Sequence, residues 1–352
     1  MVRYSDIIKN GIKKKVEAGK ENLSYPEKEI RISDLNEFGT SSELHVVPVK
    51  KDTGYMKRLF KTIADYLKEV QRLVNNNESF EIKRAVDIVN HLIKTQDIIE
   101  NFHQSLPLIN NYYRLEKDYL MLHMIMVATS SLKIGKGLRY SQEQLLELGL
   151  SALFYDIGLF KIPDNILNKS GELTTNESIV IKKHTEIGGN ILSRFQAQYP
   201  ILSRVAYEHH ERENGMGYPG SLRGDEICEY AKIIGLVDTF DAMIRNRPYR
   251  KALTGHFSVK ELVESKNLMF SSKIIKAFLD EMGIFPVGSY VRLNNMGIGM
   301  VVATSKLYPL KPAIKLIFNS QGTRVQGETI VDLKETPVLC IKAAIGEEDF
   351  PS

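Results

Sequence analysis

Residues 207–219 read YEHHERENGMGYP. Two adjacent histidines, His209 and His210, are followed directly by the carboxylate of Glu211. Neutral imidazole is the commonest metal ligand in proteins, and a nearby carboxylate often orients such a ligand through its second ring nitrogen. The glycines downstream permit a tight loop, which Tyr218 and Pro219 stiffen. The stretch therefore predicts metal ligands followed by a constrained loop, with Glu211 either orienting a ligand histidine or lying solvated at the surface.

Four more polar residues stand inside strongly apolar patterns: His123, Asp156, His184 and Asp238. A lone histidine on such a face is most often an ordinary core residue, so scattered core residues are the alternative explanation. However, an imidazole buried without a partner costs about 1–3 kcal/mol, and a buried carboxylate is rare unless it is paired or bound to a metal. We therefore expect these four groups to converge with His209 and His210 on one site.

Length and composition predict a globular protein of two or three domains, because 43% of the 352 residues are hydrophobic and 26% are charged. The formal net charge of +4 argues against binding to duplex nucleic acid. Cys228 and Cys340 form no disulfide or thiolate metal pattern, which fits a reducing cytoplasm. The N-terminus lacks the apolar core of a secretory signal, and the longest uncharged apolar stretch, residues 119–132, is too short to span a bilayer. We expect a cytoplasmic protein without a membrane span.

Apolar residues recur every three or four positions through most of the chain, and the spacing changes after Pro286. Helices are predicted over residues 55–74, 82–99, 142–154, 174–193, 201–210 and 231–243, and a capping box at Thr174 and Glu177 opens the fourth. Short strands are predicted over residues 30–32, 44–49, 290–293, 299–303, 313–318, 323–331 and 338–341. The predicted fold is mostly α, with three parts: a regulatory or dimerisation segment over residues 1–115, a helical metal-binding domain over residues 116–285 and a small β appendage over residues 286–352.

The motifs occur in an order that resembles a known family. The HHE and GYP segments are similar to the signatures of the HD-GYP phosphodiesterases, a branch of the HD superfamily that degrades the bacterial second messenger cyclic di-GMP. The remaining motifs match as His123, the HD pair at Tyr155-Asp156, His184, and Asp238. The loop over residues 162–174 and the RPYR segment over residues 247–250 also match. The resemblance covers residues 116–345 and implies an HD-superfamily helical bundle with a C-terminal β extension.

The resemblance also implies two bound metal ions. One would be held by Asp156, His184, His209 and His210, and the other by His123, Asp156 and Asp238, so that Asp156 bridges them. Because these ligands offer only nitrogen and oxygen, iron is favoured, then manganese, then zinc. Two such ions can share a hydroxide for in-line attack on a phosphodiester. The expected product is the linear dinucleotide pGpG and, after further hydrolysis, GMP.

Catalysis is assigned by the same resemblance to Asp156, Arg247 and Arg250, with the two arginines neutralising substrate phosphate through forked hydrogen bonds. The loop containing Gly217, Tyr218 and Pro219 is expected to bind substrate or to dock a diguanylate cyclase with a GGDEF domain. A purely structural turn is the alternative for this loop. The chain is further expected to form a homodimer.

Two positions depart from the family pattern. Tyr155 stands where the HD pair has histidine, so one metal position lacks an imidazole, and Leu159 stands where a phosphate-binding lysine is common. Phenol has a pKa near 10 and is a poor ligand unless it ionises. Lys161 is a candidate replacement for the missing lysine. The expected function is a cyclic di-GMP phosphodiesterase of reduced activity, and the alternative is an inactive sensor or scaffold for diguanylate cyclases.

Overall fold

The computed structural model describes residues 53–94, 119–169, 171–244, 255–265 and 268–351. Its longer helices are α2 (Thr53–Asn75), α3 (Lys83–Lys94), α5 (Tyr119–Gly137), α6 (Gln142–Phe154), α9 (His184–Leu192), α11 (Glu229–Ile244), α12 (Gly255–Glu264) and α13 (Ser272–Met282). Shorter ones are η2 (Ile157–Lys161), α7 (Asp164–Leu167), α8 (Thr175–Lys182), η3 (Ser193–Phe195), α10 (Ile201–Glu208), η4 (Gly224–Glu226) and η5 (Glu347–Asp349). The strands are β1 (Tyr290–Leu293), β2 (Ile298–Ala303), β3 (Ala313–Phe318), β4 (Ile330–Asp332) and β5 (Ile341–Ile345). The predicted fold class, mostly helical with a small C-terminal sheet, is confirmed.

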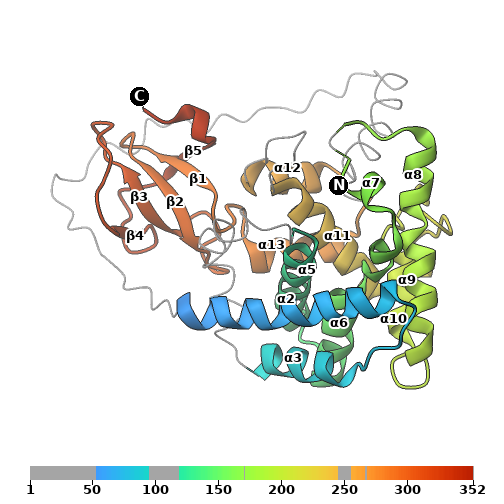
Figure 1. The fold of residues 1–352 in the computed structure, drawn as a ribbon. Helices are drawn as coiled ribbons and strands as arrows, with labels where there is room; N and C mark the ends of the chain where they lie inside the picture. Colours follow the sequence, from blue (N-terminus) through green and yellow to red (C-terminus); the bar gives the residue numbers. More distant parts are fainter. Residues whose placement is uncertain (1–52, 95–118, 170, 245–254, 266–267, 352) are drawn as a thin grey trace, which may run out of the picture.

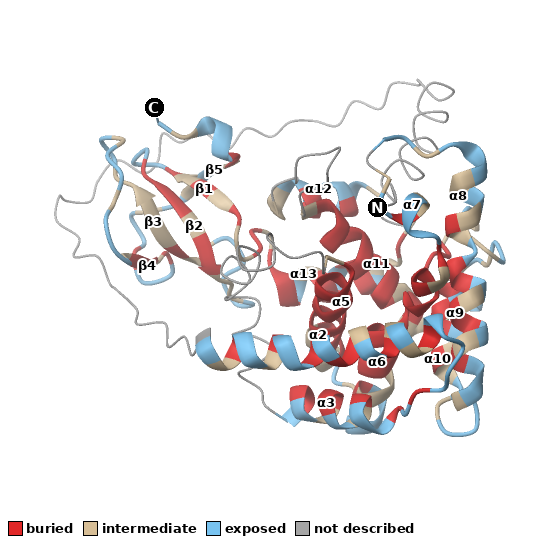
Figure 2. Ribbon diagram, viewed as in Figure 1, coloured by how far each residue is buried: buried red, intermediate tan, exposed pale blue. Residues whose placement is uncertain are grey.

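Helix α5 is the centre of the helical part (Figure 1). It is buried on nearly every face, and α2, α6, α11 and α13 all pack against it. Figure 2 shows that α6 and α11 also carry many buried residues, drawn in red. A helix that is apolar all round is stable only inside other elements, which explains why YLMLHMIMVA can carry His123 into the interior.

Helices α2 and α3 contribute to this same core. Phe60, Ile63, Leu67, Val89 and Leu92 are fully or almost fully buried in one continuous apolar cluster with the residues of α5 and α6. The apolar faces predicted for α2 and α3 are therefore buried against the other helices. The strands predicted over residues 30–32 and 44–49 and the end of the second predicted helix, residues 95–99, lie outside the described residues, and the predicted domain boundaries remain a prediction.

One predicted helix is divided in two. Residues 174–193 were expected to be continuous, but α8 ends at Lys182 and α9 begins at His184. The capping box of Thr174 and Glu177 is present as predicted. At the break, the His184 ring donates to the carbonyl of Ile181 and the Thr185 hydroxyl donates to the carbonyl of Lys182. Both side-chain hydrogen bonds lie at the break, where Lys183 has a ψ of −14°.

The C-terminal strands form one antiparallel sheet in the order β4-β3-β2-β1-β5 around its own apolar core. Two predicted strands are displaced. The fourth is limited to Ile330–Asp332, because residues 323–329 bend at Gly327, which has a φ of +82°. The fifth begins at Ile341, because a turn precedes it in which Leu339 N–H donates to the Thr336 carbonyl. In the described ranges, no helix is long and apolar enough to cross a membrane.

Candidate metal centre

The close approach of η2 to α9 brings the first ligands together. A Cβ atom on Gly158 would lie 1.9 Å from the His184 carbonyl oxygen, so only glycine lets the two backbones touch there. Asp156, which precedes η2, thereby comes beside His184, with 3.3 Å between its Oδ1 and the ring Nε2. The sequence DIG after α6 therefore positions the carboxylate by backbone packing.

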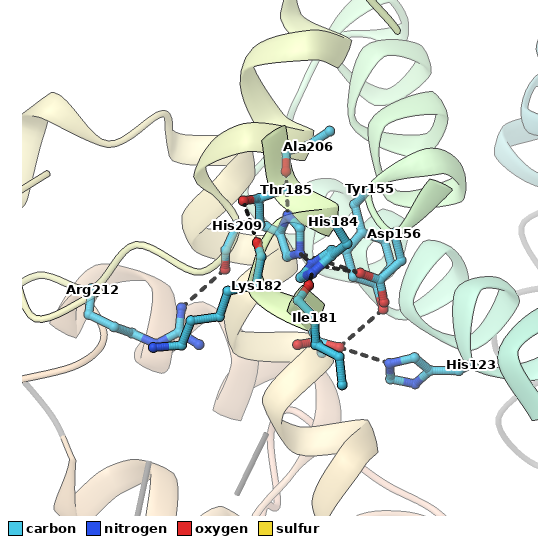
Figure 3. Close-up of polar contacts among 11 residues, drawn as sticks. His123, Tyr155, Asp156, Ile181, Lys182, His184, Thr185, Ala206, His209 and Arg212 are labelled. Atoms are coloured by element: carbon cyan, nitrogen blue, oxygen red, sulfur yellow. Dashed lines mark hydrogen bonds and ion pairs between the residues drawn. The ribbon is translucent and has the colours of Figure 1, made fainter. Parts of the chain in front are cut away.

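Three electron-rich atoms meet at this point. His184 Nδ1 donates to the Ile181 carbonyl at 2.7 Å, and His209 Nδ1 donates to the Ala206 carbonyl at 2.9 Å. In the neutral rings, the proton on Nδ1 leaves a lone pair on Nε2. The two Nε2 atoms are 3.2 Å apart, and Asp156 Oδ1 lies 3.3 and 3.5 Å from them. Figure 3 shows these groups converging on one another. Such an arrangement is repulsive unless a proton or a metal cation lies among these atoms.

The electrostatics of the histidines agree with a ligand role. Burial lowers the pKa of His184 to about 4, although the Asp156 carboxylate opposes the change. Burial, followed by the nearby His209 and His184 rings, holds the pKa of His210 well below its usual range. His184 and His210 are therefore neutral near pH 7, as metal ligation requires. His210 completes a buried group with Asp156, His184 and His209, whose donor atoms all lie within 4.8 Å of one another.

A second group of three donors shares Asp156. His123, Asp156 and Asp238 also lie within 4.8 Å of one another, but both ring nitrogens of His123 and one oxygen of Asp238 are already hydrogen-bonded. His123 is held on both ring nitrogens, by Asp238 at 2.8 Å and by Asp241 at 2.6 Å. Tyr155 donates its hydroxyl to the same oxygen of Asp238 at 3.1 Å. Burial alone would lower the pKa of His123, but the hydrogen bonds to Asp238 and Asp241 outweigh it and raise the value to about 10.

The two groups therefore differ in how well they fit a metal ion. In the four-residue group, Asp156 Oδ1 is a buried carboxylate oxygen that accepts no hydrogen bond within the described residues, although two imidazole nitrogens face it. Imidazole nitrogens and a carboxylate oxygen are suitable ligands for iron, manganese or zinc. This group fits a metal. The three-residue group accepts one only if His123 Nε2 and Tyr155 give up Asp238.

The loop after His210 lies against the centre. The Tyr218 ring stacks on the His210 ring with 4.8 Å between centroids, and the Tyr218 amide donates to the His210 carbonyl. Gly217 is required for this approach, because a Cβ there would lie 2.5 Å from the His210 carbonyl oxygen. Glu211 is buried, and it accepts hydrogen bonds from the amides of Gly220 and Leu222. The alternative of a solvated Glu211 is wrong, because the residue is buried and holds the loop closed, while its expected orientation of a ligand histidine stays a prediction.

Comparison with known proteins agrees with this geometry. Residues 104–274 match the family model of the HD domain. This segment is an HD domain. Residues 290–352 match the model of a KOW domain associated with the HD domain. The six residues that the sequence analysis singled out all lie in the HD domain, and the structure brings them together as two ligand groups that share Asp156.

Two curated relatives of the HD domain are described as cyclic di-GMP phosphodiesterases. The protein from Pseudomonas aeruginosa is 27% identical over 256 residues, a match covering 73% of this chain and 61% of that protein. The protein from Thermotoga maritima is 33% identical over 187 residues, covering 52% of this chain and 50% of that protein. The chain thus spans less than two thirds of either relative. Among solved structures, an HDG"Y"P protein from Bdellovibrio bacteriovorus has a TM-score of 0.47 and 15% identity, covering 65% of this chain and 69% of that chain.

The residues considered for phosphate binding from the sequence are Arg247, Arg250 and Lys161, with Leu159 at the position where the family has lysine. Arg247 and Arg250 lie outside the described residues of the HD domain. Leu159 is buried, and Lys161 donates to the Asn75 carbonyl and to Asn77 beyond the end of α2, so Lys161 is turned away from the centre. Asp241, the second partner of His123, was not predicted from the sequence. The signal for Asp241 was its place one turn after Asp238 on the same apolar helix, which puts both carboxylates on one face.

Proposed function

We propose that this chain is a metal-dependent phosphodiesterase that hydrolyses cyclic di-GMP. The observation that carries the proposal is the buried convergence of His184 Nε2, His209 Nε2 and Asp156 Oδ1, with separations of 3.2, 3.3 and 3.5 Å. The HD domain and the two relatives described as cyclic di-GMP phosphodiesterases support this reaction and this substrate.

The chain's own residues hold the centre rigid. The backbone carbonyls of Ile181 and Ala206 fix the rings of His184 and His209 in the tautomer that presents Nε2. The Tyr218 ring covers His210 and restricts its rotation. A metal bound by these groups supplies Lewis-acid polarisation of a phosphoryl oxygen. Arg247 and Arg250 are proposed to neutralise the substrate phosphate.

We propose two metal positions of unequal strength, filled by iron in preference to manganese and by manganese in preference to zinc. The four-residue position binds first, because its donor atoms already face one another. The three-residue position binds second and more weakly, because Asp238 must first leave His123 and Tyr155. The product is pGpG, with GMP after a second cleavage.

The site of action is proposed to be the bacterial cytoplasm. The loop at Gly217–Pro219 is a candidate docking surface for a GGDEF-domain protein, and homodimerisation is proposed through residues 1–115. One observation favours a second function, a cyclic di-GMP sensor or scaffold: the hydroxyl of Tyr155 already occupies Asp238, which reduces the centre's capacity for a second ion.

Turnover of cyclic di-GMP by protein purified without oxygen and loaded with Fe(II) or Mn(II) tests the proposal. Hydrolysis that is lost in Asp156→Ala is expected. Tight binding of cyclic di-GMP without hydrolysis, at full metal loading, would instead support the scaffold. Absence of both binding and hydrolysis in metal-loaded protein would contradict both functions.

A further inference from the structure

Two basic side chains, those of Lys182 and Arg212, lie on one side of the metal centre, and His123 lies on the other (Figure 3). Burial and the neighbouring His209 and His184 rings hold the pKa of the ligand His210 below its usual range. The charges of Arg212 and Lys182 act in the same direction with smaller effects. A phosphodiester is an anion, and a cation beside the reacting centre would contact it. The two side chains differ in whether they are available for such a contact.

Arg212 is committed to the protein. It is buried, and its guanidinium donates to the carbonyls of His209 and Glu211 at 3.1 and 2.7 Å. It also lies over the Phe270 ring, 5.1 Å from the centroid. Its hydrogen bonds hold the backbone that carries the ligand histidines. Moving Arg212 onto a substrate would break these contacts.

Lys182 lies beside the centre, and its ammonium is held differently from the Arg212 guanidinium. Its ammonium lies 4.9 Å from the centroid of Tyr218, the ring that stacks on the ligand His210. The hydroxyl of Thr185 holds the Lys182 carbonyl at 3.1 Å, within the same turn that directs His184 inward. The side chain is half-buried and makes no ion pair with any carboxylate of the described ranges. An aromatic ring positions an ammonium while leaving its donors open to an anion.

We propose that Lys182 is a substrate-binding residue that donates to a phosphate oxygen of the cyclic dinucleotide, with Tyr218 positioning its ammonium beside the metal centre. The proposal rests on the proposed phosphodiester substrate and adds to it the cation that contacts the phosphate. It also gives the Tyr218 ring two contacts at once, with a ligand histidine and with a substrate-binding lysine.

Steady-state kinetics and equilibrium binding of cyclic di-GMP to the metal-loaded full chain test the proposal. Lys182→Gln removes the charge and is expected to raise KM and the dissociation constant about tenfold or more, the usual effect of losing a charged hydrogen bond. Its kcat, metal content and melting temperature are expected to change little. Lys182→Arg keeps a cation and should recover most of the affinity. Lys183→Gln is the matched control, because the neighbouring lysine is exposed and loses the same charge.

Each outcome bears on a different claim. If the wild type hydrolyses cyclic di-GMP and Lys182→Gln binds it as tightly as Lys183→Gln does, Lys182 has no role and the proposed function stands. If Lys182→Gln loses metal and kcat together, the lysine supports the centre's structure, and the substrate contact is wrong. If the metal-loaded wild type neither binds nor hydrolyses cyclic di-GMP, the proposed function fails, and the role of Lys182 fails with it.

Discussion

The hydroxyl of Tyr155 lies 3.1 Å from Asp238, and the Tyr155 ring meets the His209 ring edge-on with 5.0 Å between centroids. The side chain is completely buried, so the phenol ring cannot turn out into solvent. It therefore acts on both ligand groups: it packs on a ligand of the first and hydrogen-bonds to a ligand of the second. This one residue makes the two positions chemically different.

Replacing Tyr155 with histidine should strengthen the second position. Tyr155→His supplies an imidazole nitrogen and removes the hydroxyl that binds Asp238, so the metal content should rise toward two equivalents per chain at a metal concentration where the wild type holds nearer one. Metal analysis after anaerobic loading measures this directly. Tyr155→Phe is the control, because it also removes the hydroxyl that binds Asp238 but adds no ligand. An equal gain in Tyr155→Phe would mean that the hydroxyl, and not the missing imidazole, limits the second ion.

Asp156 is the residue shared by both groups, and its loss should be the most damaging single change to metal binding. Asp156→Ala should release nearly all bound metal, whereas His184→Ala should chiefly empty the four-residue position. Metal analysis of both variants under identical loading, with circular dichroism as a check on folding, compares them. Equal, partial losses in the two variants would contradict a shared carboxylate.

At the scale of the element, the loop over residues 211–222 is closed by one buried carboxylate. Glu211 accepts from Gly220 N–H at 2.5 Å and from Leu222 N–H at 3.0 Å, one amide on each oxygen. The loop is thereby held so that Tyr218 covers His210. A substitution of Glu211 that loosens this loop should consequently weaken metal binding, although Glu211 is not a metal ligand.

Glu211→Gln keeps the size of the side chain but replaces one acceptor oxygen with a donor that faces a backbone amide. We expect a loss of about 1–3 kcal/mol in the free energy of unfolding, together with weaker metal binding because His210 loses its cover. Chemical denaturation and metal titration measure the two effects. Glu186→Gln, an exposed carboxylate of α9, is the control and should change neither. Unchanged metal affinity in Glu211→Gln would show that the loop is independent of the centre.

Local patterns in the sequence predicted the helices and the ligands but not the contacts between distant elements. The apolar spacing located α2, α6, α10 and α11, and the polar exceptions within it located all six groups of the centre. Asp241 and the loop-closing hydrogen bonds of Glu211 escaped prediction, because their partners are set by tertiary packing. His123 and Asp241, for example, are 118 residues apart. The break between α8 and α9 was missed because helical periodicity does not record a local change of backbone angle such as that at Lys183.

At the scale of the whole molecule, the ligands come from three helices, α5, α9 and α11, and from the turns after α6 and α10, so metal binding should stabilise the packing of the helical part. An ion that binds only the folded chain adds about 2.7 kcal/mol at a free concentration one hundred times its dissociation constant. Removing the metal with a chelator should therefore lower the melting temperature, and restoring Fe(II) or Mn(II) should recover it. Differential scanning calorimetry measures the shift. Asp156→Ala should melt at one temperature with or without chelator, and a chelator effect that persists in this variant would place the stabilising ion elsewhere.

The side chains of Asp156, His184, His209 and His210 are each at most 2% exposed. We expect an ion held among them to exchange slowly, because solvent reaches it only when the site opens locally, as it must also do to admit a substrate. Exchange is then limited by the rate of that opening and not by ligand chemistry. The ion that is abundant when the chain folds should therefore be replaced only slowly afterwards. A preparation expressed in zinc-rich medium should keep its zinc through a brief incubation with iron and lose it over a long one or after treatment with a chelator.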